Sequence, residues 1–220
     1  MAIANPPRLL RFREMRRRDL AVAADIHYEC LPHGLFPQLG RRFLRAYLAT
    51  FVDSPHAVAL VAVTHGSPVG FLVGTFEDGH HYRFVVRRHG VRLTLRGVAA
   101  IVLRPRVALR FARTRARRYA RAARRLGGRT VAPGVARANG AGVLTHVAVA
   151  PGGRGRGAGA GLVDAFVERA SARRLPAVRL VTRAGPQGAG DFYLRLGWQV
   201  AGTHGDRDGL TWARYRLDLA

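Results

Sequence analysis

A glycine-rich turn is the feature of this sequence whose residue types point most directly to chemistry. Residues 147–162 read VAVAPGGRGRGAGAGL and run from an apolar stretch into a helical pattern. Glycines let consecutive backbone N–H groups point toward one ligand, and the N-terminus of the following helix adds partial positive charge. The guanidinium groups of Arg154 and Arg156 add full charges. The segment therefore predicts a binding site for a pyrophosphate.

Three interpretations of this turn are open: a purely structural turn, a dinucleotide site and a coenzyme A site. Gly155, Gly157 and Ala160 fit the G-x-G-x-x-A fingerprint of dinucleotide-binding folds. That fold needs an acidic residue after the next strand, but the strand expected at 177–183 ends in Arg183. The succession of strand, proline, arginine, glycines and helix disfavours a purely structural turn. A coenzyme A site is the third interpretation.

Two motifs resemble those of the GNAT family of N-acetyltransferases. The glycine-rich turn is similar to the family pattern V-x-P-x-x-R-G-x-G-x-G-x-x-L, with Arg154, Gly157 and Gly159 at its arginine and glycine positions. Further on, AGDFYLRLGW (189–198) resembles the family segment A-x-x-F-Y-x-x-x-G-F. The resemblance implies an α/β (α+β) fold of the GNAT type. That fold has a mixed central sheet with helices on both faces, and acetyl-CoA is its cosubstrate.

The resemblance also implies where acetyl-CoA binds. In this family two neighbouring strands splay apart, and the cofactor lies between them. The backbone groups of Val147 and Val149 would bind the pantetheine chain, and Tyr193 would lie near the thioester sulfur, where a phenol can protonate the departing thiolate. A half-buried core aromatic is the alternative role of Tyr193. The pyrophosphate would be bound by backbone N–H groups of the turn, at Arg154, Gly155, Arg156, Gly157, Ala158 and Gly159.

His146 is the candidate proton acceptor for the attacking amine. Family members often place a glutamate on one of the splayed strands, but 143–149 and 177–183 contain no carboxylate. His146 is the only side chain there that titrates near neutral pH, and its alternative role is packing beneath a helix. His27 and Glu29 fall in the region that the resemblance assigns to the acceptor pocket. They would bind the acceptor or relay a proton, unless they form a solvated helix end.

Hydrophobic periodicity predicts the elements that position these residues. Strands are expected where apolar residues alternate or run on, and helices where they recur every three or four positions. The expected strands cover residues 8–13, 57–63, 68–76, 142–149, 177–183, 198–203 and 210–219. The expected helices cover residues 19–30, 37–51, 157–172 and 188–196. We expect one acyltransferase domain over residues 1–220, interrupted between its third and fourth strands by an insertion at about 79–140.

The insertion differs from the rest of the chain in charge. Sixteen arginines and no carboxylate lie between Arg83 and Arg129, and residues 111–126 are a basic helix candidate. We expect a largely helical segment that docks on an anionic membrane surface or binds a phosphorylated acceptor. A solvated helical hairpin, basic only through codon bias, is the alternative. Nucleic acid is disfavoured, because few aromatic side chains are available for base stacking.

Composition restricts the remaining functions. The chain has 220 residues and a formal net charge of +24, and all 37 of its Lys and Arg residues are arginine. The absence of lysine excludes a Walker-type phosphate loop and a catalytic lysine. The single cysteine, Cys30, excludes disulfide frameworks and cysteine-based zinc sites, and we expect no metal. Apolar runs are too short for a signal peptide or a spanning helix, so we expect a cytoplasmic protein with at most peripheral membrane contact.

These observations together predict an enzyme. We expect an N-acetyltransferase that moves an acetyl group from acetyl-CoA to a primary amine of a small-molecule or sugar-type acceptor by direct attack. Long-range repulsion by a chain of charge +24 disfavours polycationic acceptors such as polyamines, aminoglycosides and basic protein tails. The alternative, suggested by the missing glutamate, is a non-catalytic acyl-CoA-binding or membrane-attached module.

Overall fold

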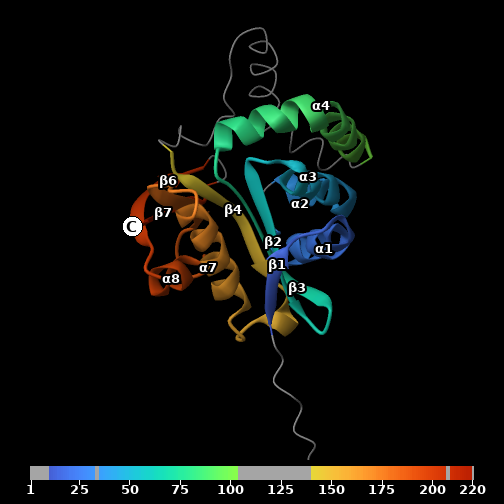
Figure 1. Cartoon of the computed structure of the whole chain (residues 1–220). Helices are drawn as coiled ribbons and strands as arrows, with labels where there is room; N and C mark the ends of the chain where they lie inside the picture. The colour runs from blue at the N-terminus through green and yellow to red at the C-terminus, as the bar shows by residue number, and fades with distance from the viewer. Residues whose placement is uncertain (1–9, 33–34, 104–139, 207–208, 220) are drawn as a thin grey trace, which may run out of the picture.

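The structure is a computed structural model that describes residues 10–32, 35–103, 140–206 and 209–219 (Figure 1). Seven strands form one sheet in the order β1-β2-β3-β4-β5-β7-β6. The strands are β1 (Arg11–Glu14), β2 (Ala57–Thr64), β3 (Ser67–Thr75), β4 (Gly142–Val149), β5 (Ala177–Arg183), β6 (Gln199–Gly205) and β7 (Thr211–Asp218). The helices are α1 (Leu20–Cys30), α2 (Leu35–Gln38), α3 (Arg41–Asp53), α4 (Asp78–Val102), α7 (Ala158–Ser171) and α8 (Gly190–Arg195). Short 3-10 turns, η1 (Arg17–Asp19) and η2 (Pro151–Gly153), precede α1 and follow β4.

The sheet is mixed, as the resemblance implies. Only β4 and β5 run parallel, and every other neighbouring pair is antiparallel. Helices α1 and α3 cover one face of the sheet, and α7 covers the other (Figure 1). This confirms the predicted fold class.

Each face of the sheet has its own hydrophobic core. Leu44 and Leu48 of α3 pack with Val61 and Val73 on one face. On the other face, α7 packs against Leu60, Leu72 and other strand residues. Successive strand side chains point to opposite faces, so a strand buried on both faces must be apolar at every position. This accounts for the uninterrupted run AVALVAV in β2.

Two element boundaries differ from the sequence prediction. The expected helix over 37–51 is two helices, because Gly40 adopts a left-handed φ of 85° directly before α3. The first strand begins at Arg11 rather than at residue 8, and residues 8 and 9 lie outside the described part of the chain. Neither change moves a residue of the predicted site to another element.

The first part of the insertion is a long helix. Helix α4 follows β3 directly and packs on α3, where the rings of His81 and Phe51 lie 4.6 Å apart. Near the other end of α4, a Cβ atom added at Gly97 would lie 3.6 Å from the Phe43 ring. Strand β4 begins only at Gly142, so the insertion lies between the third and fourth strands. The basic helix candidate at 111–126 falls outside the described residues. No helix in the described ranges is long and apolar enough to cross a membrane.

Candidate active site

Strands β4 and β5 part almost as soon as they meet. Their pairing consists of two residue pairs, Gly142 with Val178 and Val143 with Arg179. Strand β4 continues along β3 to Val149, whereas β5 pairs with β7 over its whole length. Within the described residues, the facing backbone edges of β4 and β5 are therefore unpaired toward their carboxyl ends. This is the splayed geometry in which the family resemblance expects the cofactor.

The backbone of β4 presents Val147 and Val149 toward this opening. The N–H of Ala150 donates to the Val69 carbonyl of β3 at 2.9 Å. Because backbone groups of successive strand residues point to alternate edges, those of Val149 and Val147 point away from β3. Their side chains pack against the α7 core. The backbone groups of Val147 and the N–H of Val149 are thus available for the predicted pantetheine contacts, whereas the Val149 carbonyl already accepts from Arg154.

The glycine-rich turn offers unpaired N–H groups at the end of β4. Within the described residues, the N–H groups of Gly155, Arg156 and Gly157 donate to no backbone acceptor. Gly155 and Gly157 have φ values of 70° and 79°, which side chains with a Cβ rarely adopt. Gly157 is the N-cap of α7 and supplies no side-chain cap, so the first N–H groups of that helix are unsatisfied as well. The turn can therefore donate several hydrogen bonds to one anion.

The two arginines of the turn are placed differently. The Arg154 Nε donates to the Val149 carbonyl at 3.1 Å, and its guanidinium lies 3.6 Å from the Cys30 Sγ. The thiol of Cys30 in turn lies 3.5 Å from the same carbonyl. Arg154 thus links the end of β4 to the end of α1. Arg156 is exposed and is the more available of the two side chains for a ligand.

Tyr193 is held in an aromatic cluster on α8. Its side chain is 4% exposed, and its ring lies 5.0 to 6.0 Å from the rings of Phe192, Trp198 and Tyr215. Helix α8 packs tightly on β7, since a Cβ atom at Gly190 would lie 2.5 Å from the Tyr215 hydroxyl. Burial raises the pKa of Tyr193, so the phenol is neutral at pH 7 and carries a proton that it can donate. This state suits the predicted role as an acid.

A β-bulge directs the His146 side chain to the face of the sheet that α1 and α3 cover. The register between β3 and β4 shifts so that Val73 pairs with His146 and Gly74 with Leu144, which leaves Thr145 as the extra residue. Leu144 packs in the α7 core, while His146 contacts residues of α1 and α3. Without the bulge, these two residues would point to the same face of the sheet.

His146 belongs to a buried polar group with His27 and Tyr47. The Tyr47 hydroxyl and His146 Nε2 lie 3.2 Å apart, and the His27 and His146 rings meet edge to face at 4.8 Å. Burial lowers the pKa of His27 to about 4, and burial together with the charge of His27 lowers the pKa of His146 to about 3. Both imidazoles are therefore neutral at pH 7. Neither ring nitrogen of His27 has a hydrogen-bond partner in the described part of the chain.

Glu29 lies apart from this group. Its carboxylate is exposed and 3.3 Å from Arg41, which also contacts Asp25 at 2.6 Å. The structure thus brings His27 and His146 together but places Glu29 on the outer surface of α1. Tyr47 was not among the predicted site residues. Its hydroxyl could not be assigned a partner, because β4 lies far away in the sequence.

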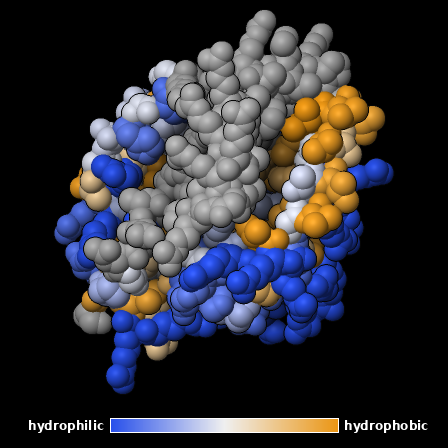
Figure 2. All heavy atoms as spheres, turned by 90° about the horizontal axis from the view of Figure 1, so that it is seen from above, coloured by the Kyte–Doolittle hydropathy of each residue, from blue (hydrophilic) through white to orange (hydrophobic). Residues whose placement is uncertain are grey.

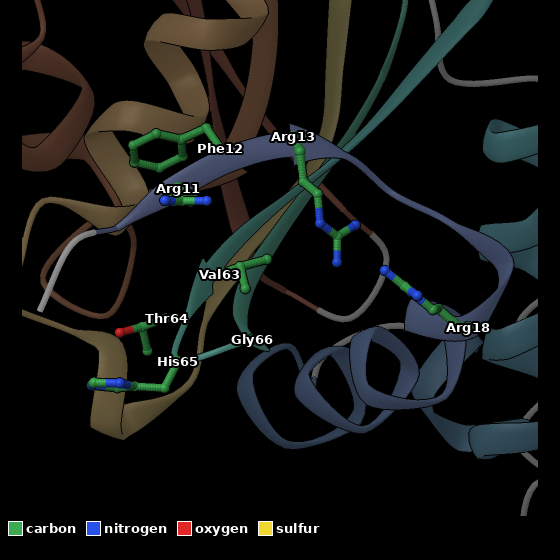
Figure 3. A pocket seen from close by; sticks show the side chains of 8 residues that line it. All are labelled: Arg11, Phe12, Arg13, Arg18, Val63, Thr64, His65 and Gly66. Atoms are coloured by element: carbon green, nitrogen blue, oxygen red, sulfur yellow. The ribbon is translucent and has the colours of Figure 1, made fainter.

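A hollow on the outer edge of the sheet is distinct from the site described above. It lies along β1 and the β2–β3 turn (Figure 3). Its lining residues are Arg11, Phe12, Arg13, Arg18, Val63, Thr64, His65 and Gly66. Strand β1 is separated from β4 by β2 and β3, and Arg13 is already paired with Asp19 at 2.6 Å. None of the predicted site residues lines this hollow.

Comparison with known proteins agrees with the geometry. Residues 113–219 match the family described as "Acetyltransferase (GNAT) domain". The matched part, just under half of the chain, contains both the glycine-rich turn and the segment at 189–198. This confirms the resemblance drawn from the two motifs and makes the protein an acyltransferase, rather than the non-catalytic module considered as the alternative. A comparison with curated proteins finds no significant match.

Solved structures show the same fold at low sequence identity. Ard1 from Thermoplasma volcanium superimposes with a TM-score of 0.57 at 17% identity, covering 96% of this chain and 98% of that one. An N-acetyltransferase from Staphylococcus aureus Mu50 has a TM-score of 0.58 at 14% identity, with 96% and 99% covered. The ribosomal-protein-S18-alanine N-acetyltransferase from Escherichia coli has a TM-score of 0.56 at 12% identity, with 96% and 95% covered. At these identities the likeness shows the fold of this chain and nothing about its acceptor.

Proposed function

We propose that this GNAT protein transfers an acetyl group from acetyl-CoA to a primary amine of a small-molecule or sugar-type acceptor. The observation that carries the proposal is the coincidence of two unpaired backbone regions. In the part of the chain that the structure describes, β4 and β5 pair only at Gly142 with Val178 and Val143 with Arg179, and the unpaired N–H groups of residues 155–157 begin where β4 ends. A pantetheine chain fits the first region and a pyrophosphate the second.

The chemistry is a direct attack on the thioester. The neutral amine forms a C–N bond to the carbonyl carbon, the C–S bond breaks, and Tyr193 gives its proton to the leaving sulfur. The proton released by the amine restores the phenol through solvent, so the products are an amide and a free thiol. His146 is a weaker base than an ordinary histidine, since its pKa is about 3. We assign it to accepting a hydrogen bond from the attacking amine, with Tyr47 and His27 beside it.

A negative charge introduced into the glycine-rich turn tests whether this turn binds the pyrophosphate of coenzyme A. A Cβ atom at Gly157 would meet nothing within 4 Å, so the side chain of Gly157→Glu has room but carries a carboxylate to the pyrophosphate position. Calorimetric titration with coenzyme A should show affinity at least about tenfold lower than wild type, which corresponds to about 1.4 kcal/mol. Gly157→Ala is the matched control, because it has the same strain from positive φ without the charge. Equal affinity in Gly157→Glu and Gly157→Ala would contradict the assignment.

The acceptor is sought by thiol release. Acetyl-CoA is incubated with amino sugars, sugar nucleotides and amino-acid amines, and the free thiol is measured against a reaction without amine. We expect amine-dependent release with at least one class and an N-acetylated product by mass spectrometry. Release that is the same with and without every amine would leave only hydrolysis and would refute the proposed transfer to these acceptors.

We also propose that α4 docks the enzyme on an anionic membrane surface. Four of its apolar side chains, Val91, Leu95, Val98 and Val102, are 52 to 77% exposed. Their spacing of four, three and four residues places them on one face of the helix. Seen from above, apolar side chains gather along one side of the molecule next to hydrophilic ones (Figure 2).

The charge of α4 complements anionic lipid. The helix carries five arginines, at 83, 87, 88, 92 and 96, and its one carboxylate, Asp78, lies at its first residue. Partial burial and the charges of Arg92 and Arg45 lower the pKa of Arg96, which shows that positive charges are crowded here. Each basic residue near an anionic bilayer contributes about 1 kcal/mol to binding. The combination of an exposed apolar stripe with flanking arginines is typical of helices that lie in the membrane interface.

Vesicle co-sedimentation tests the docking. The protein should bind vesicles with anionic lipid at low salt, less at high salt, and neutral vesicles weakly. Leu95→Glu should reduce binding, whereas Val200→Glu, a matched change at an exposed position of β6, should not. Binding that is independent of salt and lipid charge, or equal in both variants, would refute the proposal. If the wild-type protein binds no vesicles but Leu95→Glu loses turnover, the result would instead favour binding of a phosphorylated acceptor by α4.

A further inference from the structure

Three side chains able to bind a metal meet where α4 leaves the sheet. His56 directly precedes β2, Glu77 follows β3, and His80 lies in the first turn of α4. One potential ligand atom from each residue lies within 4.8 Å of the other two. The His56 Nδ1 is 3.2 Å from the Glu77 Oε2, and the His80 Nδ1 is hydrogen-bonded to the same oxygen. Both imidazoles therefore point a ring nitrogen toward one carboxylate oxygen.

The backbone between the three residues is already fixed. The carbonyl of His56 accepts hydrogen bonds from the N–H groups of Phe76 and Glu77, at 3.0 and 3.4 Å. The carbonyl of Glu77 accepts from the N–H groups of His80 and His81, at 3.0 and 2.9 Å. Bringing the ligand atoms around an ion thus requires only side-chain rotations. The side chains of His56, Glu77 and His80 are 33, 53 and 54% exposed, so an ion can reach them from solvent.

We propose that His56, Glu77 and His80 form a site for a divalent transition metal of the zinc class. Two imidazoles and a carboxylate are ligands that such ions prefer, whereas Mg²⁺ and Ca²⁺ prefer oxygen ligands alone. Three protein ligands leave room for at least one water on the ion. The inference is independent of the proposed acetyl transfer, and it differs from the sequence-based expectation of no metal. That expectation rested on the lack of cysteines and could not detect ligands brought together from three separate segments.

Local charge permits a cation here despite the net charge of the chain. Two further carboxylates lie on the segments that surround the site. Asp78 is the neighbour of Glu77, and Asp53 at the end of α3 lies 3.5 Å from His89 of α4. Glu77 and Asp78 therefore place two carboxylates at the start of α4. They offset the repulsion that the arginines of α4 exert on a positive ion.

The position of the site indicates what the ion would do. It joins the start of β2, the end of β3 and the start of α4, so it would fix the direction in which α4 leaves the sheet. The glycine-rich turn lies at the other end of β3, where Ala150 bonds to Val69. His146, which we assign to the attacking amine, pairs with Val73, four residues before Glu77, so about 13 Å of strand separates the ion from the acetyl transfer. Its role would be structural.

Zn²⁺ titration of the full chain tests the site. The protein is first treated with a chelator, and binding is then measured by calorimetry. We expect one ion per chain, with affinity at least about tenfold lower in each of His56→Ala, Glu77→Gln and His80→Ala. His204→Ala, which removes an exposed histidine on β6, is the matched control and should bind as wild type does. The unfolding temperature should rise with Zn²⁺ in wild type and in the control, but not in the three variants.

A second measurement does not depend on the variants. Wild-type protein titrated with Co²⁺ should develop visible absorption of a low-symmetry site with nitrogen ligands, and Zn²⁺ should abolish it at one equivalent. The absence of this absorption would overturn the proposal. Equal Zn²⁺ affinity in the control and in all three site variants would overturn it as well.

Discussion

The side chain of Tyr193 combines burial with an unused hydroxyl. It is enclosed by three aromatic rings, yet its hydroxyl makes no hydrogen bond within the described residues. A buried phenol that lacks an internal partner can donate to a ligand without losing an existing bond. This is the state expected of an acid that protonates a leaving thiolate.

Removing that hydroxyl should slow chemistry and leave binding intact. Tyr193→Phe keeps the ring in its cluster, so kcat should fall by roughly ten- to ten-thousand-fold while coenzyme A affinity stays within about twofold. The measurement is steady-state turnover beside calorimetry. Tyr82→Phe, at an exposed tyrosine of α4, is the control. An unchanged kcat under conditions where chemistry is rate-limiting would refute the role of Tyr193 as an acid and would leave it a packing role only.

His27 makes the folded chain sensitive to acid. Its folded pKa of about 4 is lower than the ordinary histidine pKa of 6.5, so between these pH values the unfolded chain binds a proton that the folded chain does not. The stabilisation from the neutral form is complete above pH 6.5 and is lost as pH falls toward 4. One such group changes the free energy of unfolding by about 1.4 kcal/mol per pH unit in that window.

Substituting His27 should therefore stabilise the protein in acid and impair its reaction. His27→Phe removes two buried nitrogens without partners, so the free energy of unfolding should rise at pH 5 more than at pH 7. Urea unfolding at several pH values measures the difference. The same variant should lower turnover, since it removes a polar group from the proposed acceptor side. Wild-type and variant stabilities that run parallel from pH 7 to 5 would contradict the burial argument.

At the scale of elements, the crossing of α7 over β3 depends on a glycine. A Cβ atom at Gly74 would lie 2.7 Å from the Phe166 ring and 2.8 Å from the Val143 carbonyl. Gly74→Ala should thus destabilise the fold by about 1–3 kcal/mol. Gly79→Ala, where a Cβ atom meets nothing within 4 Å, should be neutral or slightly stabilising because it lies in a helix. Denaturant unfolding of the two variants measures this difference in the free energy of unfolding. Equal stabilities of Gly74→Ala and Gly79→Ala would refute the packing argument.

The helices and strands were largely predictable from the sequence. The irregularities that orient their side chains were not. Strands β2 to β5 and helix α7 follow from apolar runs and helical spacing, because local patterns reflect which face of an element is buried. The bulge at Thr145 leaves no such pattern, yet it decides which face His146 occupies. The break at Gly40 is likewise hidden in an otherwise periodic stretch.

The candidate site also has a part that the sequence predicts and a part that it does not. The turn at 154–159 was recognisable, because its glycines and arginines are contiguous in the sequence. The contact of Tyr47 with His146 and the group of His56, Glu77 and His80 join distant segments. Such contacts become visible only when the sheet order is known. The role of each site residue remains a prediction to be tested by the variants above.

At the scale of the whole molecule, the five arginines of α4 lie away from the cofactor turn. Helix α4 lies at one end of the sheet and the turn at the other (Figure 1). If α4 docks on anionic lipid, the turn faces away from the bilayer and stays open to acetyl-CoA from solution. We therefore expect coenzyme A affinity to be the same, within about twofold, with and without anionic vesicles. A loss of affinity on vesicles, measured by equilibrium dialysis, would contradict this orientation.

The short contact between β4 and β5 has a mechanical consequence. The ladder of the sheet narrows there to two residue pairs, so strands β1 to β4 and strands β5 to β7 form two half-sheets with a weak seam. A cofactor bound between β4 and β5 would contact both half-sheets and would hold them together. Amide hydrogens of β5 should then exchange with deuterium more slowly when coenzyme A is present, while those of β2, far from the seam, should be unaffected. A cut in the chain between the half-sheets would leave two fragments whose reassembly depends on the ligand.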